Sequence, residues 1–502
     1  MIRFQVGNTN TSVFGADRYQ LQVFSKTISY PTEVAIAKQK GIPLPYPVDN
    51  NWDGWIRFLR TPQTKAPWFP SGLLYKLTAV CTQLQIPFEI QDHRVRPEET
   101  VPDFPAIDLR DYQAEAVKVA TERGKGVLDM PPRSGKTRTM AEIVRRLGLP
   151  AIWIAPTDRI CSQTAGVLQG FFGEGYCYQL VGSDKKRIEK NQHTRVIVCT
   201  TATAANLPED LYATREVLVI DEYHHAASKS YHKGIFPKCD HIFYRFGMTG
   251  TFFRSGIDEM ALHAYLSETI YRVTAQVLID KGFLVPTQVL FLPVICPRLS
   301  GMPNTSYQGA HGKYGIQEHR HRNRLVTWAS LYLANIGKKV LVLVGTKKQG
   351  RILLEMMRAL TRPNPKQNYA PVEFISTDTP RPRQQKIIDA FLEGNLVKIL
   401  IGTSLLGEGV DLPTADALVY ARAEKAEVSL TQNAYRVSTA LPGKDRALII
   451  DFADRHNAKL LRHSQQRLAV YFAEPTFHVT VLEDAMQMPV WLDKNFLAQI
   501  EC

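Results

Sequence analysis

Short, largely apolar runs recur along most of the chain, with stretches of helical spacing between them. The first half contains GVLDM (126–130), AIWIA (151–155), RVIVCT (195–200), EVLVID (216–221) and IFYRFGM (242–248). The second half contains KVLVLVG (339–345), VEFIS (372–376), VKILIGT (397–403), ALVYAR (417–422) and ALIIDF (447–452). Apolar strands that alternate with helices predict parallel sheets covered on both faces. We therefore expect two tandem doubly wound α/β domains, with ligand sites at the carboxyl ends of their strands.

The N-terminal 100 residues follow another pattern, rich in Pro, Trp and turn residues. IRFQV (2–6) and YQLQVF (19–24) predict strands, and GLLYKLTAVCTQL (72–84) predicts a helix from its apolar spacing. A polar, proline-punctuated linker follows. The expected organisation is a small α+β domain at 1–100, α/β domains at 101–285 and 286–475, and a C-terminal tail at 476–502.

Composition narrows the class of partner. The chain has 502 residues, a net charge of +13 and seven scattered cysteines without a CxxC pair. The charge favours a polyanion, with nucleic acid first and a membrane surface second. The cysteine pattern disfavours a disulfide framework or a zinc site. The N-terminus lacks the apolar core of a signal peptide, and no apolar run approaches the roughly 20 residues of a bilayer span. We expect a soluble, cytoplasmic protein with no membrane partner.

The segment DMPPRSGKTRT (129–139) follows an apolar run and opens a predicted helix. Its residues Ser134, Gly135, Lys136 and Thr137 fit the end of a phosphate-binding loop, in which Lys136 reaches the β- and γ-phosphates and Thr137 ligates Mg²⁺. Met130 stands where the first glycine is usual, so the pattern is incomplete. The alternative is a plain N-capped turn. The setting between a strand and a helix favours a site for ATP and Mg²⁺.

Consecutive acids end another apolar run in VLVIDEYHH (217–225). In a nucleotide-hydrolysing site, Asp221 would hold Mg²⁺ through its water shell, and Glu222 would orient or deprotonate the attacking water. A solvated turn is the alternative. The order Asp221, Glu222, Tyr223, His224 matches D-E-x-H, and together with the phosphate loop it favours catalysis.

With these motifs in this order, residues 109 to 455 resemble a superfamily 2 helicase, which implies two RecA-like domains with an ATP cleft between them. LRDYQ (109–113) resembles the Q-motif, with Arg110 and Gln113 at the adenine. The resemblance also places Gly409 and Asp411 of motif V near the nucleotide.

The same resemblance implies contacts to nucleic acid. They would come from motifs Ia, Ic, IV and V, at Pro156, Thr157, Thr200, Thr201, Gly345, Thr346 and Thr403. GMTGTFFR (247–254) resembles motif III, so the hydroxyls of Thr249 and Thr251, with His224, would couple the nucleotide site to the nucleic-acid track. A capped turn is the alternative for the two threonines.

Motif VI departs from the family pattern Q-x-x-G-R-x-x-R. Gln432 and Arg436 are present, but Tyr435 replaces the glycine and Thr439 replaces the second arginine. Arg436 could stabilise the transition state alone, or Lys444 or Arg446 could substitute. The basic run HGKYGIQEHRHRNR (311–324) could bind backbone phosphates or form a solvated helix face.

The N-terminal segment NNWDGWIRFL (50–59) with FPSGLL (69–74) resembles the small domain of UvsW-type phage branch-migration helicases. That resemblance implies DNA binding by Trp52, Trp55 and Arg57, which mix stacking surfaces with a cation. Both tryptophans could instead be core residues.

The expected function is an ATP-dependent DNA helicase or translocase, monomeric, that acts on single-stranded, forked or junction DNA in replication, recombination and repair. The alternatives are an RNA-remodelling helicase, a restriction-type motor, or a slow or non-hydrolysing nucleotide-gated DNA-binding protein.

Overall fold

The computed structural model describes the chain except residues 42–48, 50–51, 101–103, 183–184, 229, 251–258, 297–311, 362–371, 394–395, 404–405, 407–411, 425–426 and 498–502. The chain divides into two compact units. The first comprises Met1–Pro131 and Gly135–Val273, and the second comprises Pro132–Ser134 and Thr274–Cys502.

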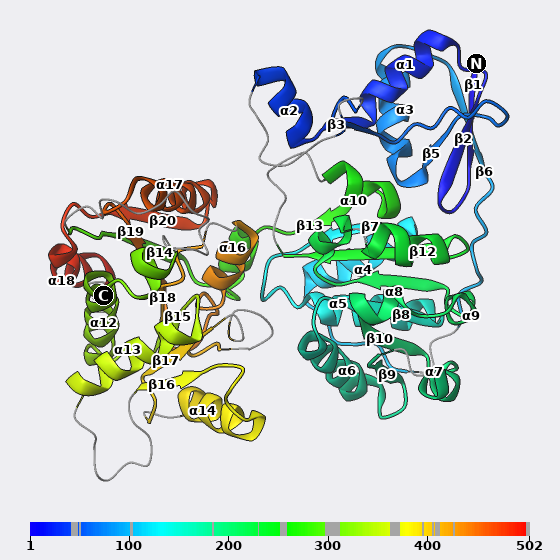
Figure 1. Ribbon diagram of the computed structural model, residues 1–502. Coiled ribbons are helices and arrows are strands. Elements are labelled where there is room, and N and C mark those ends of the chain that lie inside the picture. Colours follow the sequence, from blue (N-terminus) through cyan, green and yellow to red (C-terminus); the bar gives the residue numbers. More distant parts are fainter. Residues whose placement is uncertain are drawn as a thin grey trace. The chain divides into compact units, whose positions relative to one another are not determined.

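The N-terminal module is a small α+β domain within the first unit (Figure 1). Its sheet has the order β5-β2-β1-β6, in which β1 pairs antiparallel with β2 and parallel with β6. The strands are β1 (Ile2–Val6), β2 (Asn10–Phe14), β5 (Trp68–Pro70) and β6 (Phe88–Asp92), with a separate pair β3 (Ser29–Pro31) and β4 (Trp55–Arg57). The helices are α1 (Arg18–Thr27), α2 (Glu33–Lys40) and α3 (Leu74–Gln83), with a 3₁₀ turn η1 (Ser71–Leu73).

One predicted strand of this module is wrong, because residues 19–24 lie in helix α1. Asp17 caps the helix, accepting from the backbone N–H of Gln20, whose side chain bonds back to the backbone of Asp17. This reciprocal capping box fixes a helix start. Leu21, Phe24 and Ile28 then face the module's core at helical spacing, a period that the alternating run YQLQVF hides.

The first α/β domain is built on a seven-stranded sheet with the order β13-β7-β12-β11-β8-β10-β9. All its pairings are parallel. The strands are β7 (Lys125–Asp129), β8 (Ala151–Ala155), β9 (Cys177–Leu180), β10 (Val196–Thr200), β11 (Val217–Ile220), β12 (Tyr244–Thr249) and β13 (Thr269–Arg272). The helices are α4 (Asp111–Arg123), α5 (Lys136–Leu147), α6 (Asp158–Phe172), α7 (Lys185–Asn191), α8 (Thr201–Ala205), α9 (Glu209–Ala213) and α10 (Glu259–Leu266). Short turns η2 (Tyr223–Ala227), η3 (Tyr231–Ile235) and η4 (Phe236–Cys239) follow β11.

The second α/β domain repeats this architecture in the second unit, with a seven-stranded sheet of order β16-β17-β15-β18-β19-β14-β20. All its pairings are parallel. The strands are β14 (Thr287–Pro293), β15 (Val340–Leu343), β16 (Val372–Ile375), β17 (Ile399–Gly402), β18 (Ala417–Tyr420), β19 (Ala447–Ala453) and β20 (Phe477–Val481). The helices are α11 (Ala275–Asp280), α12 (Arg320–Asn335), α13 (Lys347–Leu360), α14 (Arg381–Glu393), α16 (Glu427–Tyr435), α17 (Ala458–Ala473) and α18 (Met488–Leu492). Further turns are η6 (Lys313–Gln317), η7 (Ala485–Gln487) and η8 (Asp493–Leu497).

The predicted fold class is confirmed, since two parallel sheets with flanking helices follow a small N-terminal domain. Two boundaries differ from expectation. The chain passes between the units at Val273 and Thr274 rather than near residue 285. The segment 476–502, expected to be a tail, supplies β20 to the second sheet and Met488 and Leu492 to its core. The sequence did not signal this last strand because FHVTV, of which only Phe477 is buried, is not a continuous apolar run.

Across the described ranges, no helix combines the length and the apolar character that a membrane crossing requires.

Candidate nucleotide and nucleic-acid site

The phosphate-loop segment joins the fully buried strand β7 to helix α5. Gly135 precedes the helix with φ 79°, a left-handed conformation that favours glycine. A Cβ on Gly135 would lie 2.3 Å from Nε2 of Gln113. The ammonium of Lys136 donates to the carbonyl of Met130 over 3.3 Å. The Lys136 side chain therefore folds back onto the start of the loop. Thr137 is half-buried in the first turn of α5.

Gln113, the predicted adenine contact, lies beside this loop. Its Oε1 accepts from the backbone N–H of Arg110 over 3.0 Å, which caps helix α4. Its side-chain amide nitrogen faces Gly135. The Arg110 guanidinium donates to the hydroxyl of Tyr112 over 2.8 Å. The side chain of Gln113 thus joins the start of α4 to the phosphate loop, and its adenine contact remains a proposal.

Asp221 and Glu222 follow β11 at the carboxyl edge of the same sheet. Asp221 is buried, and the backbone N–H of Glu222 donates to its Oδ1 over 2.9 Å. Burial, with a smaller effect from the charge of Glu222, raises the pKa of Asp221 to about 7, while the Lys136 ammonium opposes that rise. A divalent cation at this carboxylate would favour its ionised form. The residues here therefore fit Mg²⁺, and Thr137 and Asp221 would be its protein contacts.

Glu222 itself has an unusual backbone, with φ 46°. This left-handed conformation is uncommon outside glycine and marks a strained turn at the strand end. Its Oε2 lies 3.4 Å from Nδ1 of His224. Burial, followed by the electrostatic effects of His225 and Lys136, lowers the pKa of His224 to about 3. His224 is therefore neutral near pH 7, and a neutral ring can hydrogen-bond the carboxylate only through an N–H.

Thr249 ends β12, the strand that lies between β7 and β11 in the sheet. Its carbonyl accepts from the backbone N–H of Met130 over 2.9 Å. Strand β12 thus lies between the phosphate loop and the acidic strand end, and a coupling role for Thr249 stays a prediction. Thr251 lies outside the described residues.

Sequence reasoning missed an ion pair at this edge. The carboxylate of Asp129, the last residue of β7, lies 2.8 Å from Nε of Arg272 on β13. Burial raises the pKa of Asp129, and the charges of Arg272 and Lys136 oppose that rise. The signal was a lone acid inside the apolar run GVLDM, because a buried carboxylate needs a cation nearby.

The nucleic-acid candidates of the first domain also lie at the carboxyl ends of strands. Thr157, after Pro156, caps α6 by accepting from the N–H of Ile160 over 3.3 Å. Thr200 caps α8 in the same way. The hydroxyl of Thr201 lies 3.1 Å from that of Tyr231. These hydroxyls have local structural roles, and contact with a nucleic-acid backbone stays a prediction.

The second domain repeats the arrangement at β15. Thr346 caps α13, accepting from the N–H of Gln349 over 3.2 Å, and the Gly345 N–H donates to Oε1 of Gln349 over 3.2 Å. Thr403 follows β17 and is buried. Gly409 and Asp411 lie outside the described residues.

Motif VI has a structural reason for its unusual aromatic residue. Tyr435, at the end of α16, is buried; its hydroxyl lies 3.1 Å from that of Thr476, and its ring packs on Phe477. The side chain therefore joins α16 to the start of β20. Gln432 lies on the same helix, and Arg436 follows directly after it.

The two cations considered as substitutes for the missing arginine have other partners. Lys444 is half-buried, and its ammonium donates to the carbonyl of Ala415 over 2.6 Å. Burial lowers the pKa of Lys444 to about 8. Arg446 donates to the carbonyl of Asn495 over 2.7 Å and pairs with Asp445. These contacts favour Arg436 as the motif VI cation.

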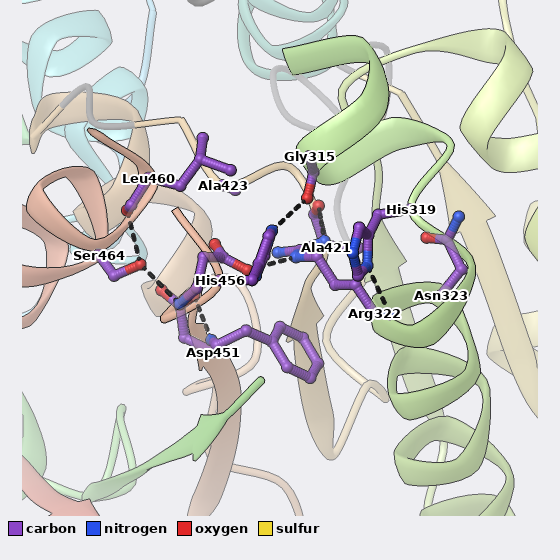
Figure 2. Close-up of polar contacts among 12 residues, drawn as sticks. Gly315, His319, Arg322, Asn323, Ala421, Ala423, Asp451, His456, Leu460 and Ser464 are labelled. Atoms are coloured by element: carbon purple, nitrogen blue, oxygen red, sulfur yellow. Dashed lines mark hydrogen bonds and ion pairs between the residues drawn. The ribbon is translucent and has the colours of Figure 1, made fainter. Parts of the chain in front are cut away.

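The basic run at 311–324 is not a wholly solvated face. Arg322 is fully buried on α12, where its Nε lies 2.7 Å from Asp454 and its Nη1 donates to the carbonyl of Ala421 over 2.8 Å. Figure 2 shows Arg322 reaching this carbonyl beside the stacked rings of His319 and His456. Arg322 is thus part of a buried network that holds the end of β18.

The network continues to a second buried arginine. Arg467 on α17 is fully buried, lies 3.0 Å from Asp451 and donates to the carbonyl of Ala423 over 3.0 Å. Ala423 has φ 59°, so this arginine fixes a left-handed backbone. The two arginines hold the carbonyls on either side of residue 422, in the segment that leads to motif VI.

The three candidates of the N-terminal module lie around β4. Trp52 is 38% exposed, and its indole N–H donates to the carbonyl of Trp55 over 3.2 Å. Trp55 is half-buried, and the exposed Arg57 pairs with Asp53. The all-core alternative does not fit Trp52, and DNA contact by this exposed tryptophan and arginine stays a prediction.

Comparison with known proteins agrees with this organisation. The family "Type III restriction enzyme, res subunit" matches residues 106–254, and the family "Helicase conserved C-terminal domain" matches residues 323–439. The protein "Putative DNA 3'-5' helicase Rad25" of Haloarcula marismortui is 26% identical over 68% of this chain and 52% of its own length. "DNA 3'-5' translocase XPB2" of Sulfurisphaera tokodaii is 23% identical over 73% of this chain and 88% of its own length. This chain thus spans about half the length of the first relative.

One solved structure is similar in fold, and a second is matched over most of this chain. The ATP-dependent Type ISP restriction-modification enzyme LlaBIII bound to DNA covers 82% of this chain and 35% of its own, with 13% identity and a TM-score of 0.56. The crystal structure of T4 UvsW covers 96% of this chain and 99% of its own at 16% identity, with a TM-score of 0.45, which is too low to support a structural argument. The ordered motifs, the two matching families and the tandem parallel sheets support a superfamily 2 helicase.

Proposed function

We propose that the protein is an ATP-dependent DNA translocase or helicase that unwinds or branch-migrates forked and junction DNA. The observation that carries the proposal is the meeting of Lys136, Asp221 and Thr249 at the carboxyl edge of one parallel sheet. The charge of Lys136 acts on Asp221, and Thr249 contacts the loop that precedes Lys136. Such edges are where doubly wound sheets bind nucleotides.

The chain's own residues divide the work of hydrolysis. The backbone before α5 and the ammonium of Lys136 bind the phosphates, and Glu222 orients the attacking water. Arg436 and Gln432 of motif VI supply the remaining polar groups, with Arg436 countering negative charge in the transition state. Bound Mg²⁺, held by Thr137 and Asp221, would neutralise phosphate charge.

Strand β12 supplies a route from hydrolysis to movement. The Thr249 carbonyl binds the first residue of the phosphate loop, so a shift of that loop moves the end of β12. His224, which lies against Glu222, is the second coupling residue. Thr157, Thr200, Thr346 and Thr403 then mark the strand ends that grip the nucleic-acid backbone, together with their neighbours Pro156, Thr201 and Gly345.

The choice of DNA is supported by the names of the relatives, which are a DNA helicase and a DNA translocase. The net charge of +13 agrees with a polyanionic substrate. Branched DNA, a monomeric form, and roles in replication, recombination and repair rest on the resemblance to UvsW-type helicases. A restriction-type motor is the second candidate, because the family matching residues 106–254 is named for a restriction subunit.

Strand separation tests the proposal directly. The full chain is incubated with labelled forked DNA, a four-way junction and a matched RNA duplex, with and without ATP and Mg²⁺. We expect ATP-dependent unwinding or branch migration of the DNA substrates. Lys136→Ala should abolish it, whereas Lys118→Ala, an exposed lysine on α4, should leave it unchanged. Translocation without strand separation would favour the restriction-type motor, and preferential RNA unwinding would contradict the DNA assignment.

A further inference from the structure

A groove of about 540 Å³ lies between the N-terminal module and the first α/β domain, within the first unit. The N-terminal module contributes Arg60 and Trp68, and the α/β domain contributes His232 and Tyr265. None of the predicted motif residues of the helicase domains lines it. Its volume falls within the roughly 300–1,000 Å³ typical of sites for small ligands, which suits one or two nucleotides of a single strand.

Close packing joins the two walls of the groove. The hydroxyl of Tyr75 on α3 lies 2.6 Å from Nδ1 of His263 on α10. A Cβ on Gly72 would lie 1.9 Å from the carbonyl oxygen of His263, so the two backbones meet where only glycine fits. Ala264 of α10 belongs to the hydrophobic core of the N-terminal module. The groove is therefore bounded by a fixed interface.

Two hydrogen bonds beside the groove strengthen this interface. The amide of Asn8 donates to the carbonyl of His241 over 2.8 Å. The buried guanidinium of Arg245 donates to the hydroxyl of Thr9 over 2.8 Å. Thr9 itself lines the groove, so its position is set by a buried side chain of the α/β domain. The site is thus preorganised, which lowers the entropic cost of binding a flexible strand.

The lining combines a cation with aromatic rings. Arg60 is exposed and takes part in none of the ion pairs found among the described residues. Its positive charge acts on Tyr265. Burial raises the pKa of that tyrosine, and the charge of Arg60 opposes the rise. Trp68 and Tyr265 are each half-buried, so each ring presents part of its surface. Sites for single-stranded nucleic acid use such cations for phosphates and such rings for bases.

A second arginine lines the groove beside Arg60. Arg57 pairs with Asp53, and both side chains are about half exposed. Exposed ion pairs contribute little stability, so a phosphate can compete with Asp53 for the guanidinium. One acid, Asp240, also lines the groove on the side of the α/β domain. The two arginines therefore place the positive charge on the N-terminal wall.

We propose that this groove binds a single-stranded segment of the DNA substrate, with a phosphate at Arg60 and bases against Trp68 and Tyr265. The proposal rests on the nucleic-acid substrate of the proposed function and adds a site outside the helicase motifs. It also gives the bound strand a contact with α10. The Leu262 carbonyl on that helix accepts a hydrogen bond from the hydroxyl of Tyr223, in the D-E-x-H segment.

Binding to a fluorescent oligothymidine, measured by anisotropy over a series of salt concentrations, tests the proposal. For Arg60→Ala in the full chain we expect several-fold weaker binding and a salt slope smaller by about one, as for the loss of one phosphate contact. Arg60→Lys should retain most of the affinity because it keeps the charge. Arg18→Ala is the matched control, since Arg18 is an exposed arginine on α1 that does not line the groove.

Cross-linking supplies an independent readout. An oligonucleotide with photoreactive iodouracil should cross-link within the peptide that carries Trp68 or the one that carries Tyr265. Unchanged affinity and salt slope in Arg60→Ala, with cross-links only elsewhere, would overturn the proposal. Tighter binding of RNA than of DNA in the groove would overturn the choice of DNA. If DNA still stimulates ATP hydrolysis in those cases, the groove proposal is wrong but the proposed function stands. If no nucleic acid changes the rate of ATP hydrolysis, the proposed function itself is wrong.

Discussion

The hydroxyl of Tyr75 lies 2.6 Å from Nδ1 of His263, and this contact joins the N-terminal module to helix α10 of the first α/β domain. Burial lowers the pKa of His263 to about 4, so the ring is neutral near pH 7. With its proton on Nε2, which faces Glu259 at 3.8 Å, Nδ1 accepts from the tyrosine. The same helix contacts Tyr223, which directly follows Asp221 and Glu222 in the sequence.

Replacing Tyr75 with Phe should loosen this interface. The change leaves a buried Nδ1 without its donor, which costs about 1–3 kcal/mol of unfolding free energy. We expect a lower midpoint for thermal unfolding of the first unit. Tyr19→Phe is the control, because Tyr19 is 69% exposed and should leave the midpoint unchanged. A midpoint equal to that of the wild type in Tyr75→Phe would mean that the hydrogen bond contributes nothing.

The stability of the first unit should fall as the pH is lowered below about 6.5. Burial lowers the pKa of His263 to about 4 and that of His224 to about 3, from an ordinary value of 6.5. In this window the unfolded chain binds protons that the folded chain excludes. Each histidine therefore lowers the free energy of unfolding by up to about 1.4 kcal/mol per pH unit as the pH falls. Thermal midpoints measured from neutral to mildly acidic pH check this.

Substitution of one of these histidines identifies its share of the pH dependence. His263→Gln should flatten the dependence between pH 6.5 and about 4, because one titrating group is removed. His93→Gln, at an exposed position of the first unit, should leave the curve unchanged. A steeper fall in His263→Gln than in the wild type would contradict the account.

Gly135→Ala should abolish nucleotide binding. The added Cβ would lie 2.3 Å from Gln113, and alanine is disfavoured at φ 79°. Gly173, which ends α6, offers a matched control, since it has φ 85° and a Cβ added there would meet no atom within 4 Å. Gly173→Ala should cost about 1–3 kcal/mol of stability, because its φ 85° and ψ 167° suit glycine alone, with normal binding of a fluorescent ATP analogue. Equal binding of the ATP analogue by both variants would show that Gly135 is not part of the nucleotide site.

Asp454→Asn should destabilise the second unit strongly. Arg322 is fully buried and pairs with Asp454, so the change leaves a buried charge without its counter-charge, at a cost of about 3–5 kcal/mol. Asp378→Asn removes a half-exposed carboxylate that pairs with Lys347 and Arg351, and should cost about 1 kcal/mol or less. Urea unfolding of both variants measures the difference, and equal costs would show that Arg322 finds other partners.

Arg436→Ala should lower kcat for ATP hydrolysis by at least about a thousandfold if it is the transition-state arginine. Lys444→Ala should mainly lower stability, because its ammonium donates to the carbonyls of Ala415 and Pro413. Steady-state kinetics and thermal unfolding of each variant separate the two effects. A large fall in kcat for Lys444→Ala, with normal kinetics for Arg436→Ala, would reverse the assignment.

The sheets could be predicted from sequence because parallel strands buried on both faces form apolar runs, as ALIIDF does for β19. The capping box at Asp17 was missed, since a period of two in YQLQVF masks the helical spacing of Leu21, Phe24 and Ile28. Strand β20 was missed because its residues FHVTV are mostly not buried, so the strand lacks the continuous apolar run of its neighbours.

Some residues of the candidate site could be predicted from the sequence, and others could not. Lys136, Asp221 and Glu222 could be predicted, because motif residues follow apolar runs that end at one sheet edge. The pairing of Asp129 with Arg272 could not, since β7 and β13 lie far apart in the sequence. The Tyr75–His263 contact spans 188 residues and leaves no local signal. The buried Arg322 resembled a surface cation because its neighbours in the run are basic too.

ATP hydrolysis by the full chain, measured with and without nucleic acid, tests whether the protein is a nucleic-acid-dependent ATPase that needs Glu222. Wild-type protein is compared with Glu222→Gln, which removes the water-orienting carboxylate, and with Glu122→Gln, a control at an exposed glutamate on α4. We expect hydrolysis that rises with single-stranded and branched DNA, disappears in Glu222→Gln and persists in Glu122→Gln. Hydrolysis that no nucleic acid changes, or that survives in Glu222→Gln, would contradict this expectation.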